Sequence, residues 1–221
     1  MPARKLVLYV THLATFLSHC EMAFYFQKLN FPIVNDYLSS KLRDGKRAHS
    51  ESYNRSYGHA NTITDLNTAI LKTMRDKKTR TIREQLVLSK ETDQYILRGR
   101  IDELVIKPDR IIIIDDKNSD TISPVLLPVY KTQLQLYCFL FYEQFFPMVD
   151  VYYRLRKIKK SSREPDHIFY ESKFDHTIHT WKKRLDKLFQ WWSEEVPLSK
   201  TTNPANCVGC FFRDNPCDGV Q

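Results

Sequence analysis

The sequence predicts a mixed α/β domain in which helices pack on a central sheet. Two observations predict this class. Apolar residues recur at helical spacing near both ends of the chain and once in its middle, whereas the segments between them are rich in β-branched residues and alternate or run apolar. The chain has 221 residues, 42% hydrophobic and 27% charged, which is enough to bury a core. The order of elements fits helices flanking one sheet.

The N-terminal part, residues 1–78, is expected to be mainly helical. Apolar periodicity predicts helices over residues 11–29, 34–56 and 62–76. Thr11 is the expected cap of the first helix. The whole chain, 1–221, is expected to form one domain.

Residues 79–172 are expected to form the sheet core. Three consecutive strands are predicted over 80–90, 94–106 and 110–117, with a Pro-Asp turn between the last two. The remaining predicted elements are a helix over 126–145, strands over 148–158 and 166–172, and a helix over 174–195 that opens the C-terminal segment 173–221.

The net charge of +8 favours an anionic partner, of which nucleic acid is the commonest. A basic cluster runs from the end of the strand predicted over 148–158 into the hairpin that leads to the next strand, where it predicts contacts to DNA phosphates. A solvated hairpin is the alternative. The cluster consists of Arg154, Arg156, Lys157, Lys159 and Lys160.

Two acids and a lysine follow strand-like segments. A run of four isoleucines ends in Asp115, Asp116 and Lys117, and Asp102 closes the preceding apolar segment. Because side chains alternate along a strand, Asp115 and Lys117 share a face. Carboxylates that converge beside an ammonium predict a Mg²⁺ or Mn²⁺ site that activates water against a phosphodiester.

Other polar residues are candidates for the same site. His49 is the expected third protein ligand, with His59 as its rival. Glu84 is either a further acid near the metal or a solvent-facing strand residue. Gln133 and Tyr137 share a helix face, where they are expected to hold the lysine or a substrate phosphate.

The C-terminal cysteines have metal-ligand spacing. Cys207-x2-Cys210-x6-Cys217 supplies three thiolates, which suit zinc or an iron–sulfur cluster, and needs one more ligand. Cys138, on an apolar helix, is expected to be a buried thiol. Without a convincing export signal or a membrane-length apolar run, a cytoplasmic protein without disulfides and without membrane contact is expected.

Four short motifs occur in the order found in the RecB-like branch of the PD-(D/E)xK nucleases. They are Gly45-x3-His49, Gly99-x2-Asp102, Asp115-x-Lys117 and Gln133-x3-Tyr137. With Cys20 before them and three cysteines after them, the chain resembles the CRISPR-associated Cas-four family from about residue 11 to 217. This resemblance implies a restriction-endonuclease-like core.

The resemblance also implies the roles of individual residues. The expected catalytic residues are His49, Asp102, Asp115, Lys117, Gln133 and Tyr137. The expected Mg²⁺ or Mn²⁺ ligands are His49, Asp102, Asp115 and the backbone carbonyl of Asp116. The expected ligands of one iron–sulfur cluster are Cys20, Cys207, Cys210 and Cys217. A 4Fe–4S cluster is favoured, with 2Fe–2S or zinc as alternatives.

The function that the resemblance implies is a metal-dependent DNA exonuclease on single-stranded ends. Prespacer processing in CRISPR spacer acquisition, with the integrase proteins as partners, and DNA repair are the expected contexts. A non-catalytic DNA-binding subunit that retains the nuclease fold is the alternative, and a zinc-stapled interaction module is a third. Polarity, with 5′-to-3′ as one option, end-dependent or internal cutting, and the oligomeric state stay open.

Overall fold

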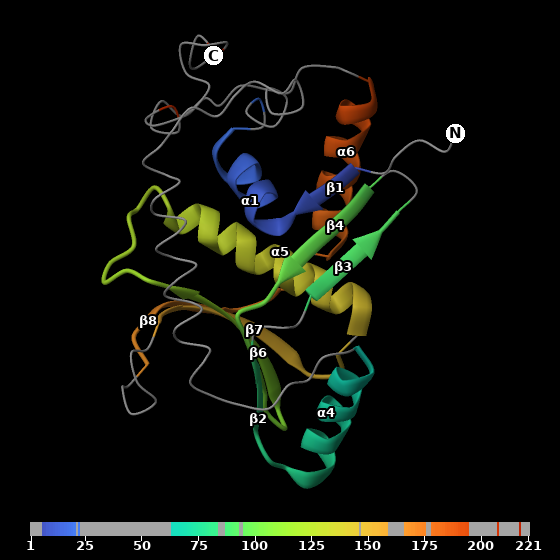
Figure 1. The fold of residues 1–221 in the computed structure, drawn as a ribbon, viewed down its shortest axis with the longest axis vertical. Coiled ribbons are helices and arrows are strands. Elements are labelled where there is room, and N and C mark those ends of the chain that lie inside the picture. The colour runs from blue at the N-terminus through green and yellow to red at the C-terminus, as the bar shows by residue number, and fades with distance from the viewer. Residues whose placement is uncertain are drawn as a thin grey trace.

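The computed structural model contains two sheets and a long helix that packs against both (Figure 1). The residues that it describes are 6–20, 22, 63–83, 87–92, 95–145, 147–158, 166–175, 178–194, 207 and 217. The mixed α/β class predicted from the sequence is confirmed.

The larger sheet has five strands in the order β2-β5-β6-β7-β8. The bounds are Arg80–Arg83 for β2, Glu103–Ile106 for β5, Arg110–Lys117 for β6, Asp150–Lys157 for β7 and Ile168–Lys173 for β8. The β6 and β7 strands are parallel and the other pairs are antiparallel, so this sheet is mixed. The β6 strand lies at the centre of this sheet, and its four consecutive isoleucines are buried, which shows that both faces of the sheet are covered there.

The smaller sheet has three strands in the order β1-β4-β3, and the sequence did not predict it. The bounds are Leu6–Tyr9 for β1, Tyr95–Arg100 for β4 and Val87–Glu91 for β3. The prediction of one strand over 80–90 is wrong, because β2 and β3 lie in different sheets. The prediction of one strand over 94–106 is wrong for the same reason, since β4 and β5 separate at Ile101 and Asp102.

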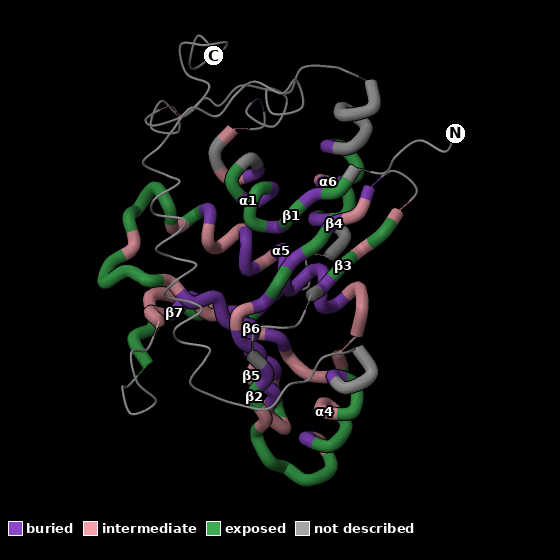
Figure 2. Tube along the Cα trace, in the orientation of Figure 1, coloured by how far each residue is buried: buried purple, intermediate pink, exposed green. Residues whose placement is uncertain are grey.

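The α5 helix, Leu127–Phe145, is the centre of the core. It packs against the α1 helix, Val10–His19, and against strands of both sheets. Figure 2 shows buried residues along much of its length. A helix that is covered on several sides needs apolar residues all round rather than a single stripe, and the segment Leu136–Tyr142 is buried without interruption. The polar Gln133 within this helix therefore needs a polar partner.

Two further helices complete the described structure. The α4 helix, Ile63–Asp76, confirms the helix predicted over 62–76, and the α6 helix, Ile178–Glu194, matches the last predicted helix. The helix predicted over 34–56 lies outside the described residues. Within the described part of the chain, no helix has the length and apolar character needed to cross a membrane.

Candidate active site

The end of β6 places consecutive residues on opposite faces of the larger sheet. Asp115 and Lys117 lie on the face that α5 covers, and the Lys117 Nζ atom is 2.7 Å from Asp115 Oδ2. Asp116 points the other way, toward Arg156 on β7. The alternation expected from the sequence is therefore present, and we call these the front face and the back face.

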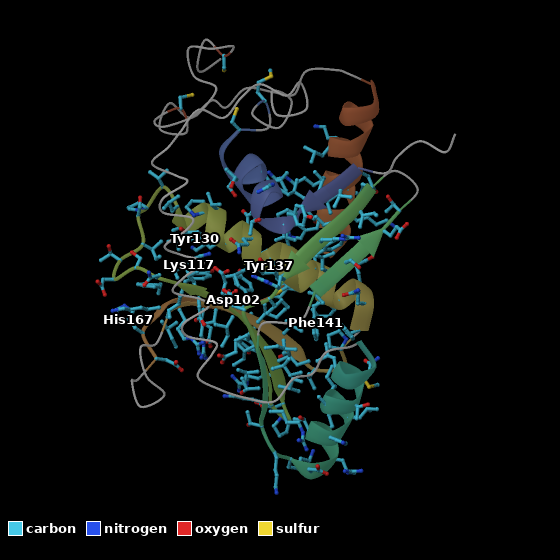
Figure 3. The ribbon with its side chains drawn as sticks, viewed as in Figure 1. Asp102, Lys117, Tyr130, Tyr137, Phe141 and His167 are labelled. Atoms are coloured by element: carbon cyan, nitrogen blue, oxygen red, sulfur yellow. The ribbon has the colours of Figure 1, made fainter. Side chains whose placement is uncertain are left out.

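Asp102 joins the front-face site from the junction between the two sheets. Its Oδ2 atom accepts a hydrogen bond of 2.9 Å from the backbone N–H of Asp116. The backbone pairing of β5 with β6 ends at Glu103 and Ile114. The N–H of Asp116 lies beyond this last pair, and the Asp102 carboxylate accepts its hydrogen bond in place of a backbone carbonyl. Asp102 and Asp115, the two carboxylates that the sequence predicted to converge, lie close enough for the charge of Asp115 to raise the pKa of Asp102. Figure 3 shows Asp102 near Lys117.

Lys117 is held as an ammonium. Burial alone would lower its pKa, but the neighbouring Asp115 carboxylate and the more distant Asp102 offset this and raise the pKa above its ordinary value. The ammonium also lies 4.3 Å from the centre of the Tyr130 ring, a cation–π contact. Figure 3 shows Lys117 and Tyr130 side by side at the start of α5. A lysine in this state donates hydrogen bonds and does not accept a proton.

The polar face of α5 covers Asp115. The Nε2 atom of Gln133 donates 2.9 Å to Asp115 Oδ1 and 3.0 Å to the hydroxyl of Tyr137. Burial, followed by Asp115 and Asp102, raises the pKa of Tyr137, so its phenol stays neutral. The i, i+4 pair expected from the sequence is present, but its partner is Asp115 rather than the lysine.

Gly99 allows the tyrosine to approach the β4 strand. A Cβ atom at this position would lie 2.8 Å from Cε1 of Tyr137 and 2.9 Å from Cγ2 of Val10. Both distances are shorter than carbon atoms tolerate, so any larger residue would push α5 or α1 outward. The glycine three residues before Asp102 therefore has a packing role that fixes the wall of the site.

The back face holds an ion cluster around Arg156, which is 4% exposed. Its guanidinium donates two hydrogen bonds to Asp116, of 2.8 and 2.9 Å, and two to Glu103, of 2.9 and 3.3 Å. A fifth bond of 3.3 Å reaches Asp166. Burial raises the pKa of Asp116, and the bonds from Arg156 offset part of that effect. We call Arg156, Glu103 and Asp116 the clamp.

The basic cluster of the hairpin is divided by the structure. Arg156 is buried and engaged by carboxylates, so the expectation that it contacts DNA phosphates is corrected. Arg154 is paired with Glu171 and lies 3.8 Å from Asp166. Lys157 is paired with the exposed Asp120 beside the site. Lys159 and Lys160 lie outside the described residues.

Several other predicted residues cannot be placed. His49, its rival His59, Glu84 and Cys210 lie outside the described residues. Cys20 and Cys207 are partly buried, while Cys217 and Cys138 are buried, as expected for Cys138.

The acidic pair fits a divalent cation by its chemistry. Burial, followed by the charge of Asp115, raises the pKa of Asp102 to about 8, although the Asp116 N–H and Lys117 offset part of the increase. A cation between the two carboxylates would relieve this repulsion, and carboxylate oxygens are the ligands that Mg²⁺ and Mn²⁺ favour. Among the described residues, no three His, Cys, Asp or Glu side chains cluster closely enough to hold a metal. Any further protein ligand thus comes from elsewhere in the chain or from backbone.

Sequence reasoning missed Tyr130 and the clamp. Tyr130 could have been found, since it lies three residues before Gln133 on the same helix face. Glu103 and Arg156 could not, because their partners come from strands whose register the sequence does not specify.

Comparisons with known proteins bear on this site. A family model described as "PD-(D/E)XK nuclease superfamily" matches residues 36–215. A solved structure described as "Crystal structure of SSO0001" has a TM-score of 0.42 and 18% identity over 95% of this chain and 84% of that one. That likeness is too low to support an inference. A search of curated proteins gives no match. Because the family model spans most of the sequence, including Asp102, Asp115 and Lys117, the chain belongs to the PD-(D/E)XK nuclease superfamily, whose members are mostly nucleases.

Proposed function

We propose that this chain is a Mg²⁺- or Mn²⁺-dependent deoxyribonuclease. The observation that carries the proposal is the meeting of Asp102, Asp115 and Lys117 at the end of β6. Two buried carboxylates that repel each other, beside an ammonium that offsets only part of the repulsion, form a site that favours a cation.

The ligands of the cation would be Asp102, Asp115 and the backbone carbonyl of Asp116, with His49 as a further candidate. When bound, the metal would polarise the scissile phosphate and lower the pKa of the attacking water. The hydrogen bond from Gln133 orients the Asp115 carboxylate toward Lys117 before any ligand arrives. Such outer contacts tune the ligands that they hold.

Lys117 serves as a donor to the reacting phosphate. Because its pKa is raised, it keeps its proton at neutral pH and does not act as a general base. Its ammonium would stabilise the negative charge that builds on the phosphate oxygens. The contact with Tyr130 limits the directions in which the side chain can move.

The finer proposal is an exonuclease on single-stranded DNA ends. The sequence resemblance supports it, and the proposed phosphate contacts are Arg154, Lys157, Lys159 and Lys160. Because Lys157 and Asp120 are paired beside the site, DNA binding would replace Asp120 by a phosphate.

An iron–sulfur cluster and a CRISPR context are further proposals that rest on the resemblance. Cys20, Cys207, Cys210 and Cys217 are the proposed ligands, with a 4Fe–4S cluster favoured and a structural role. Iron and sulfide analysis of the purified protein tests the cluster, since a zinc protein would contain neither. Prespacer processing beside integrase proteins is the proposed context, with DNA repair as the alternative.

The experiment is time-resolved digestion of single-stranded DNA labelled at either end, with Mn²⁺ and with a chelator. Wild-type protein should shorten the DNA progressively with metal and leave it intact with chelator. Asp115→Ala should reduce the rate by about 10³-fold or more, within the range that single catalytic groups supply. Asp109→Ala, an exposed acid in the β5–β6 turn, is the matched control and should cut normally.

Undiminished cleavage by Asp115→Ala would refute the assignment of the site. Binding of DNA without any metal-dependent cleavage by the wild-type protein would instead favour a non-catalytic DNA-binding subunit.

A further inference from the structure

The clamp lies directly behind the catalytic acids. Glu103 immediately follows Asp102, and Asp116 immediately follows Asp115. Arg156 binds the carboxylates of Glu103 and Asp116 through its planar guanidinium, with two hydrogen bonds to each. One side chain therefore links the two residues that directly follow the proposed catalytic acids in the sequence.

The contacts of Arg156 lie at the end of the backbone pairing between β5 and β6. The backbone pairing of β5 and β6 runs from Ile106 opposite Ile111 to Glu103 opposite Ile114 and ends there. Beyond that point, the chain at Asp102 is joined to β6 by the hydrogen bond from the Asp116 N–H to the Asp102 side chain, and Glu103 is joined to Asp116 through Arg156. The spacing of β5 and β6 at the site thus depends on contacts such as those of the clamp.

The rigidity of the guanidinium suits it to this task. Its nitrogens lie in one plane in a fixed fork, so two bidentate carboxylates are held at a defined separation. A buried ion cluster is weak evidence for stability, because desolvation of the charges offsets their attraction. Ordering of the neighbouring strands is the role that its geometry supports.

We propose that Arg156 is a positioning residue that sets the separation of Asp102 and Asp115 through Glu103 and Asp116. The proposal deepens the proposed function, on which it rests. Arg156 itself touches no substrate or metal, since it lies on the back face of the sheet. Its effect on catalysis passes through the spacing of the two metal-binding carboxylates.

The test is the affinity for Mn²⁺ of Arg156→Lys in the full chain, measured by calorimetry without DNA. Lysine keeps the positive charge but lacks the paired donors of the guanidinium. The protein should therefore still fold, while the separation of Asp102 and Asp115 becomes less well defined. We expect Mn²⁺ affinity to fall by about 10- to 100-fold, as for other residues that orient metal ligands. Cleavage should recover at high Mn²⁺, and the KM for DNA should stay within about twofold.

A second variant and a matched control separate positioning from general damage. Glu103→Asp keeps the charge but shortens one arm of the clamp, and it should also weaken Mn²⁺ binding. Arg110→Lys is the matched control, since it removes a guanidinium from the opposite end of β6, where its partner Asp109 adjoins no catalytic acid. Its Mn²⁺ affinity should match that of the wild type.

The outcomes distinguish this proposal from the proposed function. Folded Arg156→Lys or Glu103→Asp with wild-type Mn²⁺ affinity would overturn the positioning role while leaving the nuclease intact. Failure of both variants to fold would assign Arg156 to stability and overturn it as well. If Arg156→Lys weakens Mn²⁺ binding but the wild-type protein cuts no DNA, the positioning role of Arg156 is supported and the proposed nuclease activity is refuted. No Mn²⁺ binding by the wild type would overturn both.

Discussion

The front and back faces at the end of β6 use the same kinds of charge in opposite ways. On the back face, Asp116 and Glu103 share the guanidinium of Arg156 through well-aligned hydrogen bonds. On the front face, Asp115 contacts Lys117, and Asp102 keeps a raised pKa despite its hydrogen bond and its neighbouring ammonium. Asp115 and Asp116 are consecutive residues of one strand. Asp116 belongs to a cluster in which each charge has a close partner of opposite charge, whereas Asp115 lies beside a second acid that repels it.

This difference supports the proposal that the front face carries the active site. A cluster in which each charge has a close partner resists change and holds strands in place. A buried carboxyl group whose pKa is raised lowers the stability of the folded state at neutral pH and favours a cation that relieves the repulsion, a common property of functional sites. Substitutions that reduce charge should therefore have opposite effects on the two faces.

The largest expected effect is on the back face. Glu103→Gln removes one charge from the clamp and leaves the buried Arg156 with fewer partners. The free energy of unfolding of the metal-free protein should fall by about 3 kcal/mol, because the loss of one member of a buried ion pair leaves a charge uncompensated. Urea unfolding at neutral pH measures the change.

Asp109→Asn is the matched control, since it removes an exposed acid from the turn between β5 and β6. Its effect should stay within about 0.5 kcal/mol. Equal stabilities for the two variants would contradict the view that the back face is a matched structural cluster.

The sequence predicted the long periodic elements of the fold. β6, α4 and α5 lie within one residue of their expected bounds, because strong periodicity and flanking turns define them. The predicted strands over 80–90 and 94–106 failed because each apolar run crosses from one sheet to the other. Periodicity reports which residues are apolar, but not the sheet in which they pair.

The same limit applies to the candidate site. Asp102, Asp115 and Lys117 were predictable because each follows an apolar run, and Gln133 with Tyr137 because helix spacing places them on one face. The clamp was not predictable, because pairing of β6 with β7 sets Asp116 opposite Arg156. The excess of basic residues instead suggested that this arginine contacts phosphate, a role that burial rules out.

A smaller effect on stability is expected at Gly99, where close packing of β4 against α5 forms one wall of the front-face site. Gly99→Ala places a methyl group 2.8 Å from the Tyr137 ring and should lower the free energy of unfolding by about 2 kcal/mol. Combining it with Tyr137→Leu should cost less than the sum of the single changes, because the smaller side chain leaves room. Ser89→Ala, on the exposed side of the neighbouring β3 strand, is the control. Additive losses in the double variant would place the strain elsewhere.

The smallest expected effect has the opposite sign to the first and comes from the adjacent residue. Asp102→Asn removes the repulsion with Asp115 and keeps an oxygen that can accept from the Asp116 N–H. The metal-free protein should gain about 1 kcal/mol of stability, a typical gain when an unfavourable charge at a functional site is relieved. DNA cleavage should be lost, since the variant lacks one of the proposed metal ligands.

The effect of added Mn²⁺ on thermal stability tests whether the front face binds a cation. The metal should raise the melting temperature of the wild type, because a ligand that binds the folded state stabilises it, and should have much less effect on Asp102→Asn. Thermal unfolding with and without Mn²⁺ measures both quantities in one series. A metal-free Asp102→Asn protein less stable than the wild type would show that hydrogen bonding outweighs repulsion at Asp102. The front face would then be as well matched as the back face, and its acids would need no cation.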